Sequence, residues 1–464
     1  MTKIKLNTSM ILMSIVMLTA IATWVIPAGK YDKVQQGSKK VLVEGSFRYI
    51  ESSPQNIFDM LQAPMKAFGR PTTAEIMAFL LIISGAFMVI EKTGAITAAI
   101  KHASAMFVKH PSMRKLFIPI GMLLFSIGGA TFGMSEETLI FIPIFIPLAI
   151  SLKYDSAIGV AVPFIGAAAG FAGAFMNPFT LGISQGIAEI PLYSGFGYRL
   201  IVWSFVTAAA IVFVMLYARK IEKTPSASIT YDLDKERKDE LHLTDNVGER
   251  FTLHRKLVLL AFAAAMVGLV VGVLKFDWYI TEIGALFFGL AITAAVLGRL
   301  KVNEATKAFY DGVRDMAEIV FLLALATSII IIAENGNILD TILHHFAAVI
   351  SNLKPVFASW AAFIMQTFIN FFIPSGSGKA VLTMPILAPL SDLIGLSRQT
   401  MILAYQFGDG WGNICMPTSA VLLGAIGMAQ IPFQKWFRFV MPLVAAWVML
   451  SFIFLSVAVY INWQ

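Results

Sequence analysis

Long apolar stretches separated by short polar segments dominate the chain. An α-helix needs about 20 mostly apolar residues to cross a bilayer. Stretches of at least roughly that length predict an all-α polytopic membrane protein with about nine transmembrane helices. They fall near residues 10–27, 73–90, 156–190, 196–218, 257–274, 279–298, 315–333, 399–430 and 436–460.

Two further apolar stretches, 113–152 and 355–393, are broken near their middle by the polar tips 131–138 and 374–379. Each stretch fits either two spans or one re-entrant hairpin, which enters and leaves the membrane on the same side. The hairpin reading gives nine spans plus two hairpins. Polar backbone at membrane depth is tolerated only inside protein or beside a water-filled cavity, so both tips are candidate sites.

Composition supports a membrane protein. Of 464 residues, 58% are hydrophobic and 14% are charged, against about a quarter charged in soluble domains. The formal net charge of +7 does not indicate nucleic-acid binding, because most of the 35 Lys and Arg residues flank apolar stretches. One cysteine, Cys415, excludes a disulfide framework. The apolar start with Lys3 and Lys5 resembles a signal peptide, but its length favours an uncleaved first span.

The basic residues also predict an orientation. A cytoplasmic N-terminus places 23 of the 35 Lys and Arg residues inside and 11 outside, with Lys379 in the membrane. That is the bias of the positive-inside rule. The segment 219–256 carries nine basic and eight acidic residues, which predicts a solvated cytoplasmic linker. The expected location is a bacterial cytoplasmic (inner) membrane.

The two halves repeat one another at an offset of 242 residues. The repeat predicts a first half over 1–218, a linker and connecting span over 219–278, and a second half over 279–464. Basic residues crowd 91–115, whereas the matching 333–357 holds only Lys354, so the halves are expected to be inverted. The matches are Pro143 with Pro385, Pro147 with Pro389, Gly166 with Gly408, Gly170 with Gly412, and Gly182 with Gly424.

Four charged residues fall in the broken regions: Glu136 and Glu137 in the first tip, Lys379 in the second, and Asp409 in the span 399–430. Charges inside the membrane are costly and usually functional. A helix N-terminus at each tip suits a carboxylate, and an acidic residue suits an amine or a coupling proton. The structural alternative is an ion pair between hairpin and span.

The spans 156–190 and 399–430 each contain a polar, proline-containing break, at 177–180 and 416–419. Proline removes a helical hydrogen bond, so unwinding there frees carbonyl groups. Together with polar side chains, those carbonyls can hold a substrate or a sodium ion. The alternative is a kinked structural helix. The predicted substrate-binding residues are Ser135, Glu136, Glu137, Thr138, Asn177, Pro178, Thr180, Ser375, Gly376, Ser377, Gly378, Lys379, Asp409, Asn413, Pro417, Thr418 and Ser419.

Other motifs fail. Residues 376–380 resemble the end of a phosphate-binding loop, but Ala380 replaces its Ser/Thr and Ile373 stands at its first Gly. The pair His344-His345 has no partners at metal-ligand spacing. No zinc-protease motif occurs. We therefore expect no enzymatic activity, no ATP coupling, no metal site and no cofactor beyond a coupling ion, sodium or proton.

Segments 20–31, 133–137, 374–378 and 406–410 resemble the YfcC-like carriers, which belong with the anaerobic four-carbon dicarboxylate carriers and the ion-transporter superfamily. The resemblance covers nearly the whole chain. It implies secondary transport by a homodimer, with a scaffold subdomain, a moving transport subdomain and elevator-type alternating access. The tips here, 135–137 and 375–377, lack the Ser-Asn-Thr of the sodium-dicarboxylate branch.

These observations predict a secondary active transporter of a small organic solute, expected to be a basic amino acid such as arginine, ornithine or lysine. Acidic residues in both halves favour a cationic substrate. A four-carbon dicarboxylate or other carboxylate is the alternative, and it would need more positive charge than Lys379 supplies. A membrane-embedded enzyme or a receptor is a distant third reading.

Overall fold

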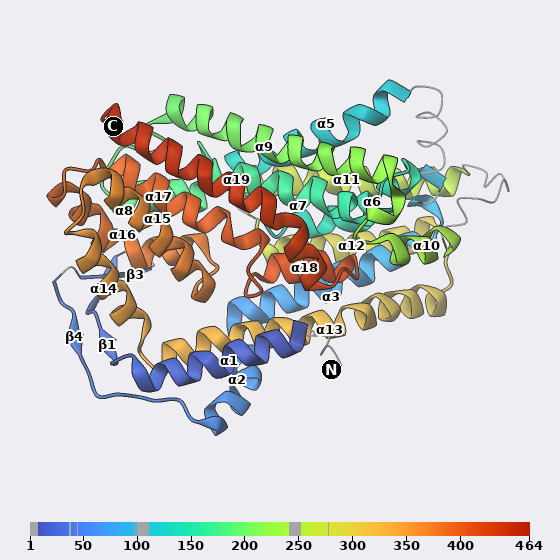
Figure 1. Ribbon diagram of the computed structural model, residues 1–464. Coiled ribbons are helices and arrows are strands. Elements are labelled where there is room, and N and C mark those ends of the chain that lie inside the picture. The colour runs from blue at the N-terminus through green and yellow to red at the C-terminus, as the bar shows by residue number, and fades with distance from the viewer. Residues whose placement is uncertain are drawn as a thin grey trace.

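The computed structural model describes residues 8–36, 39–43, 45–96, 98–99, 111–240, 252–276 and 278–464. Helices make up most of it (Figure 1). In the first half they are α1 (Thr8–Val25), α2 (Ile57–Phe68), α3 (Pro71–Lys92), α5 (Pro111–Thr131), α6 (Thr138–Ser151), α7 (Ser156–Ala172), η1 (Pro178–Gly182), α8 (Ile183–Ile187) and α9 (Phe196–Lys223).

The remaining helices begin with η2 (Pro225–Ala227) and α10 (Tyr231–Glu240) in the linker segment. They continue with α11 (Leu253–Phe276), α12 (Ile280–Leu297), α13 (Val302–Asn335), α14 (Leu339–Ile350), α15 (Pro355–Phe372), α16 (Gly376–Leu393), α17 (Arg398–Gly410), η3 (Gly412–Ile414), α18 (Ala420–Met428) and α19 (Phe433–Tyr460). A mainly helical, multi-pass membrane fold is confirmed. Within the described ranges, six helices have the length and composition to cross a membrane.

Both broken stretches divide into two helices at the predicted tip, which fits either two spans or one re-entrant hairpin. The stretch 113–152 folds as α5 and α6 with a turn between them, and 355–393 folds as α15 and α16. The spans 156–190 and 399–430 each divide into separate helices around a short irregular segment. Helix α13 begins at Val302, earlier than the predicted 315, because its polar first turns remain helical before the apolar run starts.

Four short strands and helix α14, which the hydrophobic pattern did not predict, lie at one end of the bundle (Figure 1). Strand β1 (Gly29–Lys30) pairs antiparallel with β4 (Arg48–Tyr49), and β2 (Lys33–Gln36) with β3 (Lys39–Leu42). The His344 ring on α14 stacks on Phe47 with ring centroids 4.0 Å apart. This histidine therefore packs in an aromatic cluster.

The helices pack in two groups. In the first group α1, α2 and α3 pack on α13. Helix α12 packs on α3, and α11 packs on α12. In the second group both hairpins, both broken spans, α9 and α19 pack on one another. Figure 1 shows α1, α2, α3 and α13 along one side of the bundle and α9 with α19 on the opposite side.

The packing of the second group recurs in both halves. Helix α5 packs on α7, and α15 packs in the same way on α17. The second arm of each hairpin contacts the other half of the chain: α6 contacts α18, and α16 contacts α8. An internal repeat predicts this recurrence, and the division of the chain into two inverted halves remains a prediction.

Close packing at two glycines, Gly166 and Gly408, explains why the repeat is visible in the sequence. A Cβ atom at Gly166 would lie 3.2 Å from the Phe125 Cβ, and one at Gly408 would lie 2.8 Å from the Thr367 backbone nitrogen. These four positions are related by the same offset. In both halves a hairpin arm approaches a broken span closely enough that only glycine fits without displacement.

Candidate functional site

The second hairpin and the second broken span meet at an ion pair. Lys379 Nζ lies 3.0 Å from Asp409 Oδ1, and both side chains are fully buried. Lys379 is in the first turn of α16, and Asp409 is in the last turn of α17. The structural ion pair between hairpin and span is therefore present.

Polar groups of α15 complete the surroundings of Lys379. Its Nζ lies 3.4 Å from the Gln366 carbonyl oxygen and 3.3 Å from Asn370 Oδ1. The ammonium group also lies 5.3 Å from the centre of the Tyr405 ring, within the range of a cation–π interaction. Asn370 donates in turn to Asn413 Oδ1 at 3.1 Å. Asn413, a predicted site residue, thus joins the network around Lys379.

Several oxygens near the ion pair have no hydrogen-bond partner among the described residues. They include Asp409 Oδ2, Thr180 Oγ1 and Thr418 Oγ1, all buried. A Cβ at Gly376 would lie 3.0 Å from Asp409 Oδ2 and 2.6 Å from Thr180 Cγ2, so the second tip presses against both residues. Unpaired buried acceptors are costly, and they favour a cationic or hydrogen-bonding ligand.

At each break a polar side chain caps the helix that follows. Asn177 Oδ1 accepts from the backbone N–H groups of Phe179 at 2.9 Å and Thr180 at 3.3 Å, and Pro178 is the first residue of η1. Ser419 Oγ accepts from the Leu422 N–H at 3.3 Å at the start of α18. These caps stabilise the interrupted backbone in place of continuous helix.

The first tip is the more acidic one. Glu137 is buried, and its Oε2 accepts from the Ser135 N–H at 2.9 Å. Glu136 interacts with the Tyr279 hydroxyl group at the start of α12 and is near enough to Asp409 for electrostatic repulsion. Neither glutamate forms an ion pair within the described segments. The repeat offset aligns Glu137 with Lys379, yet the partner of Lys379 is Asp409.

The remaining predicted residues lie at the tips or beside the breaks. Thr138 Oγ1 donates to the Ser135 carbonyl at 2.6 Å. Ser375 Oγ accepts from the Gly378 N–H at 3.3 Å and caps α16. Ser375 and Gly378 are exposed, Ser377 is half-buried, and Pro417 is buried. The structure thus brings Gly376 and Lys379 of the second tip next to Asp409 and Thr180, and the role of the seventeen residues in binding stays a prediction.

Sequence reasoning missed a second buried cation, Arg199. Its side chain is fully buried in α9, and it donates to Gln406 Oε1 at 2.6 Å and to Gln399 Oε1 at 3.1 Å. Gln406 donates to the Ala174 carbonyl at 2.9 Å, so the network joins α9, α17 and the first break. An arginine inside the predicted span 196–218 was the signal that could have found it.

The site is closed in this structure. A cavity of about 20 Å³ lies between the first tip, α7, α17 and α18, with Ser135, Phe171, Gly410 and Asn413 in its lining. That volume holds about one water molecule, far less than an amino acid needs. Within the described ranges no cluster of three metal-ligating side chains occurs. Binding of an amino acid in this cavity would require movement of the residues that line it.

Comparisons with known proteins identify the class. Residues 7–460 match the family model described as the C4-dicarboxylate anaerobic carrier, DcuC. The chain is 35% identical to the Escherichia coli protein named "Putative basic amino acid antiporter YfcC", covering 93% of this chain and 92% of that protein. It is 28% identical to an uncharacterized protein of Haemophilus influenzae, covering 97% and 96%.

Among solved structures, the Alcanivorax borkumensis YdaH transporter aligns over 99% of both chains, with 15% sequence identity and a TM-score of 0.42. The resemblance to the YfcC-like carriers that the sequence motifs suggested is confirmed by the family model and by the E. coli relative.

Proposed function

The chain belongs to the C4-dicarboxylate anaerobic carrier family, in its YfcC-like group, and from this premise we propose that it transports a basic amino acid by exchange or ion coupling. Membrane transport follows from the family. The substrate, the coupling mode and the movement are the proposal. A cytoplasmic N-terminus in a bacterial inner membrane belongs to the same proposal.

The observation that carries the proposal is the excess of carboxylates around the ion pair. Glu136, Glu137 and Asp409 come together with one lysine, Lys379. One carboxylate oxygen of Asp409 has no partner within the described residues. A guanidinium or ammonium group would supply the missing positive charge and hydrogen-bond donors. The name of the E. coli relative, "Putative basic amino acid antiporter YfcC", agrees with this substrate class.

The ion pair suggests how exchange can work. With no substrate bound, Lys379 neutralises Asp409, so the site can close without a bare buried charge. A cationic substrate would displace the Lys379 ammonium from Asp409 and take its place. The released ammonium and the N-terminus of α16 could then hold the substrate carboxylate. Such competition between an internal and an external cation favours exchange.

We extend the proposal to movement and assembly. The group of α1, α2, α3, α11, α12 and α13 would act as the scaffold, and the group with both hairpins would move as an elevator. Tyr279 on α12 touches Glu136 of the first tip, so this contact would break when the groups slide. The scaffold would also form the homodimer, which cross-linking of purified protein in bilayers can test.

A four-carbon dicarboxylate is the second candidate. The family description names this substrate, and Lys379 beside the start of α16 suits one carboxylate. The second carboxylate would face Asp409 and Glu136, which repel it. Only a transported proton or sodium ion would relieve that repulsion.

Uptake into proteoliposomes tests the proposal. Labelled arginine, ornithine, lysine, succinate and fumarate are supplied with and without sodium and proton gradients. We expect arginine or a related cation to be taken up and to exchange with internal substrate. Asp409→Asn should lower kcat/KM for that substrate by about tenfold or more, as for loss of a buried charge-assisted bond.

Asp232→Asn, which removes a carboxylate from exposed residue 232 on α10, is the matched control and should leave uptake unchanged. Succinate uptake without competition from basic amino acids would overturn the substrate assignment. Unchanged arginine kinetics in Asp409→Asn would overturn the role of Asp409.

A further inference from the structure

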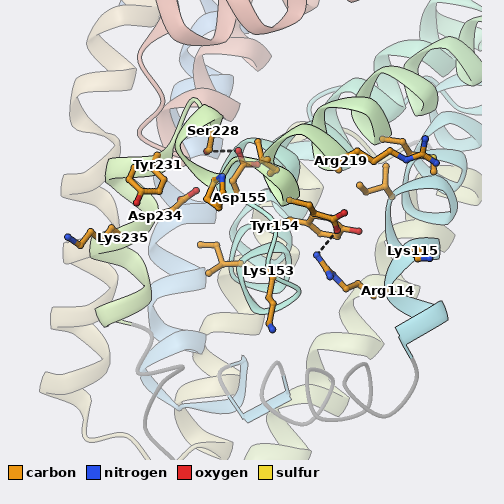
Figure 2. A pocket seen from close by; sticks show the side chains of 17 residues that line it. Arg114, Lys115, Lys153, Tyr154, Asp155, Arg219, Ser228, Tyr231, Asp234 and Lys235 are labelled. Carbon is orange, nitrogen blue, oxygen red and sulfur yellow. Dashed lines mark hydrogen bonds and ion pairs between the residues drawn. The ribbon is translucent and has the colours of Figure 1, made fainter.

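A second cavity lies far from the tips, where the start of α5, the end of α9 and the linker helix α10 meet (Figure 2). Its volume is about 920 Å³, much more than that of the closed site. The start of α5, the end of α9, the turn between α6 and α7, and α10 form its walls. Figure 1 places α10 and the start of α5 at the opposite end of the bundle from the strands.

The acidic side chains of this cavity are already satisfied. Asp155 accepts from the Tyr217 hydroxyl at 2.5 Å, from Ser228 Oγ at 2.7 Å and from the Ile158 N–H at 2.9 Å. Asp155 therefore holds the start of α7 and the linker together, and it is not available to balance a basic neighbour.

The other two acids are likewise engaged. Asp234 accepts from the Ser156 backbone N–H at 2.9 Å and from Thr230 Oγ1 at 2.6 Å. Glu222 lies 2.7 Å from Arg114 Nη2 in an ion pair, and the Arg114 guanidinium stacks over the Tyr154 ring. Because these acids are engaged, no described acidic residue of the lining balances the remaining basic side chains of the cavity.

Four basic side chains of the lining form no ion pair within the segments that the structure describes: those of Lys115, Lys153, Arg219 and Lys235. All four residues are exposed. Figure 2 shows Lys115 and Arg219 on the same side of the cavity as Arg114, with Tyr231 and Lys235 opposite. An anion entering from this side would meet several cations at once.

Apolar surface continues from the cavity along two membrane helices. Ile118 and Met215 line the cavity, and next to them Leu116 on α5 and Leu216 on α9 are 49% and 57% exposed. Exposed apolar residues follow along both helices, at Ile120 and Val212 among others. Such a surface on a membrane helix faces lipid chains, so the cavity opens where headgroups meet hydrocarbon.

We propose that this cavity binds the headgroup of an anionic phospholipid. The phosphate lies between Lys115 and Arg219, and the acyl chains follow the exposed apolar faces of α5 and α9. A basic pocket between membrane helices is the expected recognition mode for acidic headgroups. Phosphatidylcholine has no net charge and would gain little from the unpaired cations. The site lies outside the transport machinery and does not depend on the proposed substrate.

Lipid titration of the purified full-length protein in detergent, read by native mass spectrometry, tests the proposal. The probes are phosphatidylglycerol and phosphatidylcholine as lipids, and inorganic phosphate and glycerol 3-phosphate as soluble anions. We expect the wild-type protein to retain phosphatidylglycerol in preference to phosphatidylcholine. The soluble anions should compete weakly, because they lack acyl chains.

A pair of double variants locates the site. Lys115→Gln with Arg219→Gln should weaken phosphatidylglycerol binding by about tenfold or more, given the typical contribution of each basic residue near an anionic surface. Lys220→Gln with Lys223→Gln removes the same charge from the same helix end, at exposed positions outside the cavity lining. This control should change binding by less than about twofold.

Equal weakening in both double variants would show surface attraction only and would overturn the site. Equal retention of phosphatidylcholine by the wild-type protein would overturn the charge selectivity. Complete displacement by inorganic phosphate would assign the cavity to a soluble anion instead of a lipid. The wild-type comparison needs no variant, so a variant that fails to fold leaves the proposal testable.

Discussion

Lys379 on the second hairpin and Asp409 on the second broken span form a fully buried ion pair, 3.0 Å between Nζ and Oδ1. Burying two charges costs desolvation energy that their attraction does not always recover. The pair therefore gives the fold little net stability. In the proposed mechanism, the pair joins two elements that separate when a ligand enters.

A double-mutant cycle measures this coupling. Lys379→Met and Asp409→Asn should each destabilise the protein by about 3–5 kcal/mol or somewhat less, because each leaves or perturbs an unpaired buried group. The double variant should be more stable than the sum of the two effects predicts. Thermal unfolding in detergent gives the values, and strictly additive effects would contradict coupling.

Close helix packing at glycine gives a second prediction. A Cβ at Gly410 on α17 would overlap Ala172 on α7, so Gly410→Ala must push the two broken spans apart. We expect a loss of about 1–3 kcal/mol, the range for overpacking a core. Gly289→Ala on α12 is the control, since nothing lies within 4 Å of its Cβ position. An equal melting temperature for both variants would refute the close approach as a constraint.

Cys415, the one cysteine of the chain, offers a direct reporter of the second break. It lies between η3 and α18 and is half-buried, with its thiol 3.7 Å from the Trp411 carbonyl oxygen. Substrate binding at the neighbouring residues should change its reaction rate with a maleimide by about threefold or more, since small shifts in packing control access. An identical rate with saturating substrate, measured by mass spectrometry, would place the site elsewhere.

Asp155 predicts a pH dependence. Burial raises the pKa of its carboxyl group above the usual value. The folded protein therefore holds this proton more tightly than the unfolded chain, so the stabilisation is present below the unfolded pKa and is lost as the pH rises through the folded value. The Asp155→Asn variant has no titratable carboxyl group at this position, so it lacks this pH-dependent stabilisation.

The melting temperature of the wild-type protein should accordingly rise relative to that of Asp155→Asn as the pH falls from about 7.5 to about 5. Unfolding scans of both proteins across that range measure the difference. A gap that stays constant, or that changes in the opposite direction, would show that the Asp155 carboxyl group has no raised pKa.

The linear pattern of the sequence determined where the long apolar helices lie and where they are interrupted. Hydrophobic length, proline and glycine are local signals, and bilayer thickness converts them into spans with little help from packing. This is why the interruptions of both apolar stretches and the breaks of both long spans were predicted close to their observed positions. The candidate residues at the tips followed, because charge at membrane depth is conspicuous.

Only the tertiary structure decided which groups meet. The repeat aligned Lys379 with Glu137, but the folded chain pairs Lys379 with Asp409, and it buries Arg199 among glutamines. The strands, α14 and the basic cavity beneath α10 also arise from contacts between segments far apart in the chain. Side-chain partners depend on how helices pack in three dimensions, and one-dimensional hydrophobicity does not carry that information.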